Sequence, residues 1–476
     1  MLKGLKKTKI VCTLGPASEK EEVLKELVEN GLNVCRCNFS HGSHEEHKGR
    51  MDVVKKVREE LNQPIAILLD TKGPEIRTGN FDAPEVLLEE GQQFTITMRD
   101  VIGNKDICTV SYKGLASDVK SGDVILIDDG LVGLRVEKIE NDDIICTVEN
   151  SGIVKNHKGI NVPGVSINLP ALTEKDISDI EFGISQGIDY IAASFVRKPS
   201  DVLAIRDVLK KNNAEHIEII SKIENQEGID NIDSIIEVSD GIMVARGDLG
   251  VEIATEEVPI AQKMMIEKCN KAGKPVITAT QMLDSMMRNP RPTRAEVTDV
   301  ANAIHDGTDA IMLSGETAAG KYPVEAVKTM ASIAKRTEET LNYTEILRSK
   351  TIDDITVTNA ISYATCSTAM SLDASAIITF TSTGHTARMV SRFRPQCPII
   401  ATTQKDDVMR RLALSWGVCP VKVKNVGNID QMIETSIKSV KEKSYAQDGD
   451  TVVITAGAPI GVKGTTNLIK VETIGE

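Results

Sequence analysis

The chain has 476 residues, of which 41% are hydrophobic, 26% charged and only 3% aromatic, and its formal net charge is −13. This length predicts two or three soluble domains with a large, mainly aliphatic core. The negative charge and the scarcity of aromatic rings argue against nucleic acid or an anionic membrane as partners. A local cluster of Lys and Arg could still bind a small anion.

The cysteines and the N-terminus predict a cytoplasmic protein. The chain holds nine cysteines without a CxxC pair, and Cys35 and Cys37 are too close along a strand for an ordinary disulfide. Reduced thiols fit this pattern best. The basic N-terminus has too short an apolar run for a signal peptide, and we find no stretch as long as a membrane span.

Strands and helices alternate over residues 1–72, the first part of a predicted barrel. The strand "TKIVCTLG" is followed by the amphipathic helix "SEKEEVLKELVENG", for which Ser18 is the expected cap and Gly31 the expected stop. The strand "LNVCRCNFS", the helix "HEEHKGRMDVVKKVREEL" and the strand "PIAILLDT" come next. Three strands joined by two helical crossovers predict parallel pairing.

The remaining chain divides into three further segments. Residues 73–167 lack helical periodicity and show short alternating strands, which predicts an inserted all-β domain, a small barrel. Over residues 168–341 five more strand–helix units bring the total to about eight, the number in a TIM (β/α)8 barrel. Residues 342–476 predict a separate C-terminal three-layer α/β domain. The fold class is therefore α/β.

Polar residues recur where the predicted barrel strands end, which is where TIM barrels carry their active sites. Lys222 and Glu224 end one strand and, being two residues apart, lie on the same face. Other strand ends supply Arg36, Asn38 and Ser40; Asp70, Thr71 and Arg77; Arg246, Gly247 and Asp248; Thr278 and Thr280; and Ser314 and Glu316.

These strand ends predict a pocket for a phosphoryl group. Glu224 and Asp248 come from adjacent strands, and two carboxylates with room for water and ligand oxygens suit Mg²⁺. Lys222 and Arg36 would add positive charge, and the glycine-flanked turn "ARGDLGVEI" offers backbone N–H groups to an anion. The structural alternative is an ion pair between Lys222 and Glu224 that closes the barrel mouth.

Three other motifs favour structural interpretations. "GETAAGKY" nearly matches a phosphate-binding P-loop but ends in Tyr322 and Pro323 where a Ser or Thr is needed. "HGSHEEH" lacks further zinc ligands at the usual spacings, so a solvated helix start is favoured, with His41 its one functional candidate. The lysines of "SIKSVKEKS" indicate a solvated helix face.

Long motifs in the chain resemble those of the pyruvate kinase family, in the family's order and over essentially the whole length. They are "TKIVCTLGPAS", "RCNFSHG", "DTKGPEIRTG", "SKIENQEGIDNID", "MVARGDLGVE", "TATQMLDSM", "NPRPTRAEVTDVANA" and "IMLSGETAAGKYP". The resemblance implies transfer of the phosphoryl group of phosphoenolpyruvate to ADP, giving pyruvate and ATP. It also implies a homotetramer, an all-β domain that closes as a lid, and the family type without a further C-terminal domain.

The resemblance implies a role for each matching residue. Glu224 and Asp248 would hold Mg²⁺ or Mn²⁺, and Asn38, Ser40, Asp70 and Thr71 would hold K⁺, in a potassium-dependent type indicated by Glu75. Lys222 and Arg36 would bind the phosphoryl group, and Gly247, Asp248 and Thr280 the carboxylate. Asn38, His41, Arg77 and Lys158 would approach the nucleotide, and Thr280, Ser314 and Glu316 could relay a proton to the enolate.

A loop in the C-terminal domain predicts an effector site. The hydroxyl groups around Gly384 precede a helix and resemble a phosphate nest, although an ordinary helix cap is the alternative. The resemblance implies a phosphorylated allosteric activator here, and fructose 1,6-bisphosphate, AMP and a pentose phosphate all stay open. The residues concerned are Thr381, Ser382, Thr383, Gly384, His385 and Thr386.

Two other functions are compatible with the same fold. A metal-dependent lyase or aldolase acting on an enolpyruvate would need the barrel carboxylates but neither Arg77 nor the lid. A non-catalytic metabolite sensor would be expected to lack Lys222, Glu224 or Asp248, and all three are present.

Overall fold

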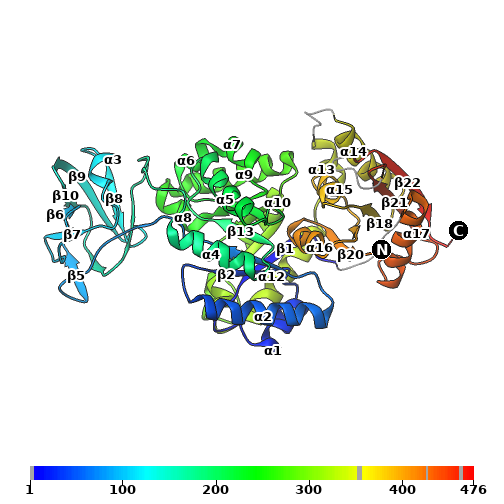
Figure 1. Cartoon of the computed structure of the whole chain (residues 1–476), viewed down its shortest axis with the longest axis horizontal. Helices are drawn as coiled ribbons and strands as arrows, with labels where there is room; N and C mark the ends of the chain where they lie inside the picture. The colour runs from blue at the N-terminus through cyan, green and yellow to red at the C-terminus, as the bar shows by residue number, and fades with distance from the viewer. Residues whose placement is uncertain (1–4, 351–355, 425–426, 460–464, 476) are drawn as a thin grey trace.

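A computed structural model of the chain describes residues 5–350, 356–424, 427–459 and 465–475. Its three larger sheets lie in a row, with a curled β-sheet at one end, a closed parallel barrel in the middle and the sheet of the C-terminal α/β part at the other end (Figure 1). The predicted fold class is confirmed, and the four segment boundaries given above stay a prediction.

The barrel consists of eight parallel strands in the closed order β1-β17-β16-β15-β14-β13-β3-β2. Their bounds are β1 Lys9–Thr13, β2 Val34–Asn38, β3 Ala66–Asp70, β13 Tyr190–Ala193, β14 Glu218–Ile223, β15 Gly241–Ala245, β16 Val276–Ala279 and β17 Ala310–Leu313. Every residue of these strands is buried except Asn38, which is half-exposed. They are buried because helices cover the outside of the barrel and side chains fill its inside.

Helices follow the barrel strands as the sequence predicts. They are α1 Glu21–Glu29, α2 His44–Leu61, α4 Glu174–Ser185, α5 Pro199–Lys211, α6 Gln226–Asp230, α7 Ile232–Val238, α8 Arg246–Glu252, α9 Val258–Ala272, α10 Arg294–Asp306, α11 Gly315–Ala318 and α12 Pro323–Glu338. Among them, α2 spans the predicted segment "HEEHKGRMDVVKKVREEL".

One helix cap was predicted wrongly. Lys20 is the N-cap residue of α1, and the hydroxyl of Ser18 instead accepts from the backbone N of Gly15 at 3.2 Å, in the turn before the helix. Gly31 follows the end of α1 with a φ of 116°, as expected. The "HGSHEEH" stretch does start a helix, since Ser43 caps α2.

The inserted β-domain, called the lid below, is a seven-stranded sheet in the order β4-β12-β8-β9-β10-β6-β7 with a two-stranded β5–β11 ribbon. An isolated bridge between Thr78 and Val110 links its two edges, so the sheet curls into the expected barrel-like form. The bounds are β4 Ile76–Arg77, β5 Glu85–Leu88, β6 Gln93–Thr97, β7 Ile107–Thr109, α3 Leu115–Asp118, β8 Val124–Ile127, β9 Val132–Glu140, β10 Asp143–Val148, β11 Gly152–Lys155 and β12 Gly159–Asn161.

The C-terminal domain has a five-stranded sheet in the order β20-β19-β18-β21-β22, in which only β22 is antiparallel. Its Ala413 and Leu414 pack with the side chains that fill the barrel interior. The C-terminal domain therefore closes the end of the barrel where the strands begin, opposite their carboxyl ends. The bounds are α13 Tyr343–Ser349, α14 Val357–Ser371, β18 Ala376–Phe380, α15 His385–Ser391, β19 Ile399–Thr403, α16 Asp406–Arg411, β20 Val418–Lys422, α17 Ile429–Glu442, β21 Thr451–Ala456 and β22 Leu468–Thr473.

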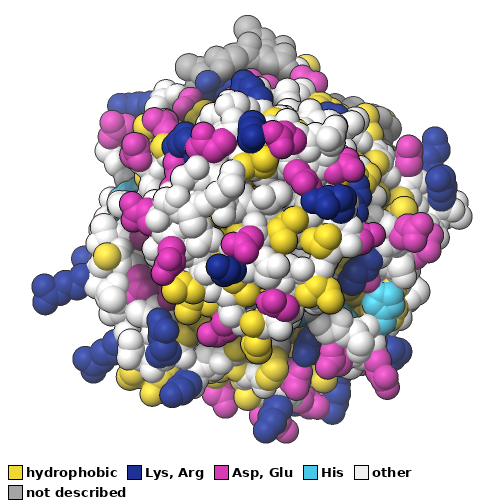
Figure 2. Space-filling view, turned by 90° about the vertical axis from the view of Figure 1, so that its left-hand side faces the viewer, with side chains coloured by type: hydrophobic (Ala, Val, Ile, Leu, Met, Phe, Trp, Pro, Cys, Tyr) yellow, Lys and Arg dark blue, Asp and Glu magenta, His cyan; other side chains and the backbone are white. Residues whose placement is uncertain are grey.

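The surface carries mixed charge. On the lid end of the molecule, basic and acidic side chains alternate around small apolar areas, so neither sign dominates that face (Figure 2). Among the helices of the described residues, none is both long and apolar enough to cross a membrane.

Candidate active site

Lys222 is the centre of a buried polar cluster at the carboxyl ends of the barrel strands. Its Nζ lies 2.9 Å from Oε1 of Glu224 and 3.2 Å from Oδ1 of Asp70, and it donates to Oγ of Ser194 at 2.8 Å. The side chain of Lys222 is only 11% exposed. All three N–H groups of the ammonium therefore have a partner within the barrel mouth.

Asp70 connects this ammonium to Arg36. Nε of Arg36 donates to Oδ2 of Asp70 at 2.6 Å, and Nη1 donates to Oγ1 of Thr13 at 2.8 Å. Burial alone would raise the pKa of Asp70, but Arg36 and Lys222 outweigh it and hold that pKa below its usual value. The carboxylate thus stays ionised between two cations.

The electrostatics of Lys222 and Glu224 are set by the same cluster. Burial lowers the pKa of Lys222, but Asp70 and Glu224 more than offset it, and the pKa is raised overall. Burial raises the pKa of Glu224, Lys222 counteracts this, and Asp248 raises it further. A cation placed between Glu224 and Asp248 would relieve that repulsion, which is the electrostatic demand of a divalent metal site.

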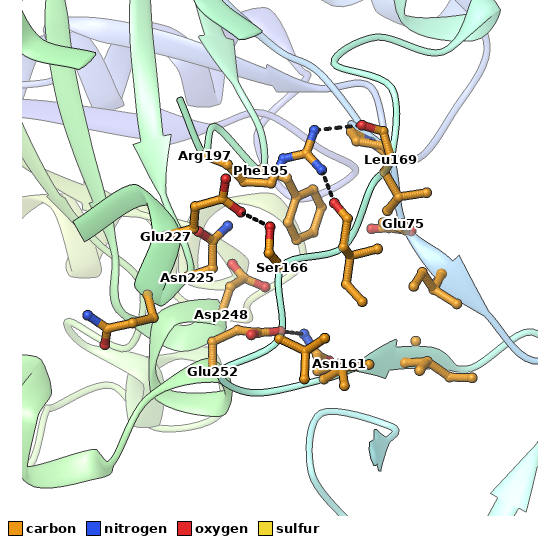
Figure 3. Close-up of a pocket in the computed structure, with 18 of the residues that line it drawn as sticks. Glu75, Asn161, Ser166, Leu169, Phe195, Arg197, Asn225, Glu227, Asp248 and Glu252 are labelled. Carbon is orange, nitrogen blue, oxygen red and sulfur yellow. Dashed lines mark hydrogen bonds between the residues drawn. The ribbon is translucent and has the colours of Figure 1, made fainter. Parts of the chain in front are cut away.

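A cavity of about 550 Å³ opens between the barrel rim and the lid. Asp248 projects into it beside Glu252, while Phe195, whose backbone N donates to Oε2 of Glu224 at 2.5 Å, lines another side (Figure 3). The cavity therefore reaches from Asp248, one of the two predicted metal carboxylates, to the lid. Its lid-side lining includes Arg77, Asp128, Asp129, Lys158 and Asn161.

Contacts with barrel residues hold the lid and its return segment over this cavity. Nδ2 of Asn161 donates to Glu252 at 2.7 Å, and Oγ of Ser166 donates to Glu227 at 3.0 Å (Figure 3). Arg197 donates to the backbone oxygens of the return segment, Ile167 at 2.7 Å and Leu169 at 2.8 Å. Each of these bonds uses at least one side chain, so they can be broken without unfolding either sheet.

The predicted nucleotide residues divide into two pairs. Arg77 and Lys158 line the cavity, where Arg77 pairs with Glu75 at 2.6 Å and Lys158 with Asp128 at 2.9 Å. Asn38 and His41 lie beyond the residues that line it, at and after the end of β2. The structure thus brings two of the four to the lid-side cavity.

The predicted potassium residues lie on two neighbouring strand ends. Asn38 of β2 is paired in register with Asp70 of β3. Oδ1 of Asn38 accepts from the backbone N of Ser40 at 3.2 Å, and Oγ1 of Thr71 accepts from the backbone N of Ser194 at 3.1 Å. The four residues therefore lie along one part of the rim.

The predicted carboxylate site is built on a strained turn. Thr280 has a φ of 70°, rare for a β-branched residue, and its hydroxyl accepts from the backbone N of Gly247 at 2.8 Å. Arg246 supports the turn by donating to the backbone oxygen of Thr280 at 2.7 Å while pairing with Asp299 at 2.7 Å. The N–H of Gly247 would have to exchange this hydroxyl for a ligand oxygen.

Glu316 is held by the backbone. Its carboxylate accepts from the backbone N of Ser314 at 2.7 Å and of Leu283 at 3.1 Å, and burial raises its pKa. Both of its oxygens thus have a backbone donor next to the end of β17.

The predicted effector residues span the turn before α15 and the first two residues of that helix. Gly384, with a φ of 92°, is the N-cap residue and makes no side-chain capping bond. Its backbone N donates instead to Oγ1 of Thr381 at 2.9 Å, and Thr386 bonds Thr466 at 2.9 Å. Ser382 and Thr383 complete the turn, and His385 begins α15, where burial lowers its pKa.

Sequence reasoning missed the end of the fourth barrel strand, β13. Ser194, which accepts from Lys222, and Phe195 follow that strand in "YIAASF", so the strand-end rule applied to the others would have identified them. Thr13, the partner of Arg36, ends β1 in the same way. The lid contacts of Arg197, Glu227 and Glu252 carry no comparable signal.

Comparisons with known proteins agree along the chain. The family model "Pyruvate kinase, barrel domain" matches residues 5–327, and "Pyruvate kinase, alpha/beta domain" matches residues 359–472. The pyruvate kinase of Clostridium acetobutylicum is 58% identical over 99% of this chain and 100% of its own length, and that of Bacillus licheniformis is 58% identical over 99% of this chain and 81% of its own.

A solved structure shows the same arrangement of domains. The crystal structure of a pyruvate kinase from Cryptosporidium parvum matches with a TM-score of 0.94 and 40% identity, covering 98% of this chain and 96% of the other. Sequence and fold agree over nearly the full length. The chain therefore belongs to the pyruvate kinase family of phosphotransferases.

Proposed function

We propose that the protein transfers the phosphoryl group of phosphoenolpyruvate to ADP, giving pyruvate and ATP. The observation that carries this proposal is the Lys222 ammonium, which is buried among Asp70, Glu224 and Ser194. Phe195, whose backbone N bonds Glu224, lines a cavity that extends to the lid. The bond between phosphorus and the enol oxygen breaks, a bond to the β-phosphate of ADP forms, and the enolate carbon takes up a proton.

Two cations of the chain would neutralise the group in transit. Lys222 and Arg36 approach from adjacent parts of the rim and are joined by Asp70, which fixes their distance. Because every N–H of Lys222 has a protein partner, one must be released to reach a phosphoryl oxygen. If Glu224 coordinated a divalent ion, its hydrogen bond from Lys222 would break, and that N–H could bind a phosphoryl oxygen.

The donor set fits the two metal ions that the family uses. We propose that Glu224 and Asp248 hold Mg²⁺ or Mn²⁺, since both are carboxylates at the same rim, and that Asn38, Ser40, Asp70 and Thr71 hold K⁺. These ions would supply charge neutralisation for the phosphoryl group. Glu75 pairs with Arg77, which is compatible with the potassium-dependent type.

Substrate orientation would depend on the backbone of Gly247 and Asp248 and on Thr280, which would receive the carboxylate of phosphoenolpyruvate. Arg77 and Lys158 would meet the nucleotide phosphates as the lid closes, and Asn38 and His41 would contribute from the rim. We assign proton delivery to Thr280, Ser314 and Glu316 through water, because they follow neighbouring strands β16 and β17.

Regulation and assembly form a further part of the proposal. We assign an activator phosphate to the loop of Thr381, Ser382, Thr383, Gly384, His385 and Thr386, supported by its hydroxyl groups and the N-terminal turn of α15. The family relationship supports a cytoplasmic homotetramer. The activator, which carries a phosphate group, could be a sugar bisphosphate, AMP or a pentose phosphate.

A coupled assay tests the reaction. ADP-dependent formation of pyruvate and ATP is measured against phosphoenolpyruvate concentration, with and without Mg²⁺, K⁺, AMP, ribose 5-phosphate and fructose 1,6-bisphosphate. Pyruvate formation without ATP would indicate a lyase instead. Absence of turnover with all ions and activators present would contradict the proposal.

A further inference from the structure

The two segments that connect the lid to the barrel meet at one carboxylate, that of Asp176 in the first turn of α4. Its Oδ1 accepts from the backbone N of Gly73 at 3.0 Å. Its Oδ2 accepts from the backbone N of Thr173 at 2.9 Å and from the hydroxyl of Thr173 at 2.6 Å. Gly73 lies where the chain leaves the barrel after β3, and Thr173 where it returns.

A helix cap accounts for only half of this arrangement. The bonds with Thr173 form a capping box, as Ser43 and Glu46 do at α2. The bond from Gly73 is additional, because its donor lies 103 positions earlier in the chain. Asp176 is 0% exposed, so water does not compete for these charge-assisted bonds. The carboxylate thus ties the outgoing and returning segments together.

Gly73 also packs against the centre of the candidate active site. Its φ is 73°, and a Cβ atom there would come within 2.9 Å of side-chain atoms of both Ser194 and Phe195. Ser194 accepts from Lys222, and the backbone N of Phe195 donates to Glu224. A displacement of Gly73 would therefore press on the residues that orient the ammonium and the predicted metal ligand.

We propose that Asp176 is a positioning residue that holds Gly73 and Thr173 together as the pivot of the lid. The inference rests on the proposed function, because it concerns closure of the lid over the nucleotide. As a pivot, the bonds of Asp176 persist in the open and closed lid. The contact between Asn161 and Glu252, farther from the pivot, is one that changes.

The test compares Asp176→Asn with Glu46→Gln. Each variant removes the charge at the third position of a capping box, but Asp176 alone also bonds a lid connection. Kinetics are measured for ADP and for phosphoenolpyruvate. Lid closure is measured by energy transfer between dyes on Lys105→Cys in the lid and Lys211→Cys in α5, which are both exposed positions. The dyes should react mainly with these two cysteines, because seven of the nine native cysteines are buried and two are half-buried.

We expect Asp176→Asn to lower kcat/KM for ADP about tenfold or more, the effect of losing one charge-assisted hydrogen bond. The KM for phosphoenolpyruvate should change less than the KM for ADP, because Lys222 and Arg36 keep their contacts with Asp70. The fraction of closed lid with ADP and Mg²⁺ should fall, and Glu46→Gln should match the unaltered protein in every measurement.

Identical kinetics and closure in the two variants would overturn the inference and leave the proposed reaction intact. If the unaltered protein makes no ATP, the proposed reaction is wrong. The role of Asp176 is then tested only by comparing nucleotide-induced lid closure in the two variants. If Asp176→Asn does not fold, hydrogen exchange in the unaltered protein decides it. The N–H of Gly73 must then exchange slowly with and without nucleotide, and loss of its protection on closure overturns the inference.

Discussion

Nζ of Lys222 lies 2.9 Å from Oε1 of Glu224, and both side chains are almost fully buried at the end of one strand. An ion pair that merely closed the barrel mouth would join the ammonium to one carboxylate, with neutral partners for the remaining N–H groups. Here the ammonium also contacts Asp70 and Ser194, and the carboxylate also accepts from Phe195. This convergence from three strand ends favours a binding site over a lone ion pair.

Replacing Lys222 with Met should abolish turnover and destabilise the protein. We expect kcat to fall by about 10³-fold or more, because the transferred group loses a buried cation. The unfolding free energy should drop by about 3 to 5 kcal/mol, because the buried carboxylates of Asp70 and Glu224 lose a partner. Steady-state assays and denaturant titration measure both. Retained turnover in a folded variant would contradict the assignment.

Glu224→Gln should weaken the binding of the divalent ion. We expect the Kd for Mn²⁺, measured by calorimetry without substrate, to rise about tenfold or more, since a neutral amide replaces a charged ligand. Glu252→Gln is the matched control, because Glu252 lines the same cavity but is bonded to Asn161. Equal affinities in the two variants would remove Glu224 from the proposed metal site.

The barrel and its strand-end residues could be predicted from sequence because both follow from local periodicity. Each buried strand ends in polar residues, and closing the barrel brings those ends together without further information. The predicted cap at Ser18 was wrong because that hydroxyl accepts from the N–H of Gly15 in a local turn, and α1 begins only after Lys20.

Contacts between distant segments could not be predicted in this way. The position of Asp176 three residues after Thr173 is typical of a helix cap. Only the fold shows that the backbone N of Gly73 is its second partner. The proton relay proposed for Glu316 stays a prediction, and the two backbone N–H groups that hold its carboxylate depend on how the loop at Leu283 packs. Long-range packing sets these partners, and single-residue patterns carry no record of it.

Ser40→Ala should raise the K⁺ concentration needed for half-maximal activity. Removing one neutral oxygen ligand is worth about 1 kcal/mol, so we expect about a fivefold increase. The kcat at saturating K⁺ should change little, because the backbone N of Ser40 still bonds Asn38. Activity is measured against K⁺ at constant ionic strength with tetramethylammonium. An unchanged potassium response would exclude Ser40 as a ligand.

Glu218→Gln should weaken the joint between the barrel and the C-terminal domain. Glu218, buried at the start of β14, accepts from Arg388 at 2.6 Å and pairs with Arg411 at 3.3 Å. The substitution removes the carboxylate charge beside two buried guanidinium groups, so the unfolding free energy should fall by about 3 kcal/mol.

The control for that joint is Asp407→Asn. Asp407 pairs with Arg411 at 2.9 Å, but its side chain is 32% exposed, so its loss should cost less than about 1 kcal/mol. Denaturant titration compares the two variants at one pH. Similar losses in both would show that the buried carboxylate is not the one that holds the joint.

Lys6 should make stability depend on pH. Its Nζ donates to the backbone oxygen of Thr8 at 2.6 Å and to Asn33 at 2.9 Å, and burial, followed by the charge of Lys9, lowers its pKa from 10.5 to about 7. Between these two pH values the unfolded chain binds more protons than the folded one, so stability rises with pH. Lys6→Met lacks this titration. The stability of the unaltered protein relative to the variant should therefore increase from pH 7 to pH 10 in thermal unfolding, and a constant difference would show that the lysine is charged in the folded protein.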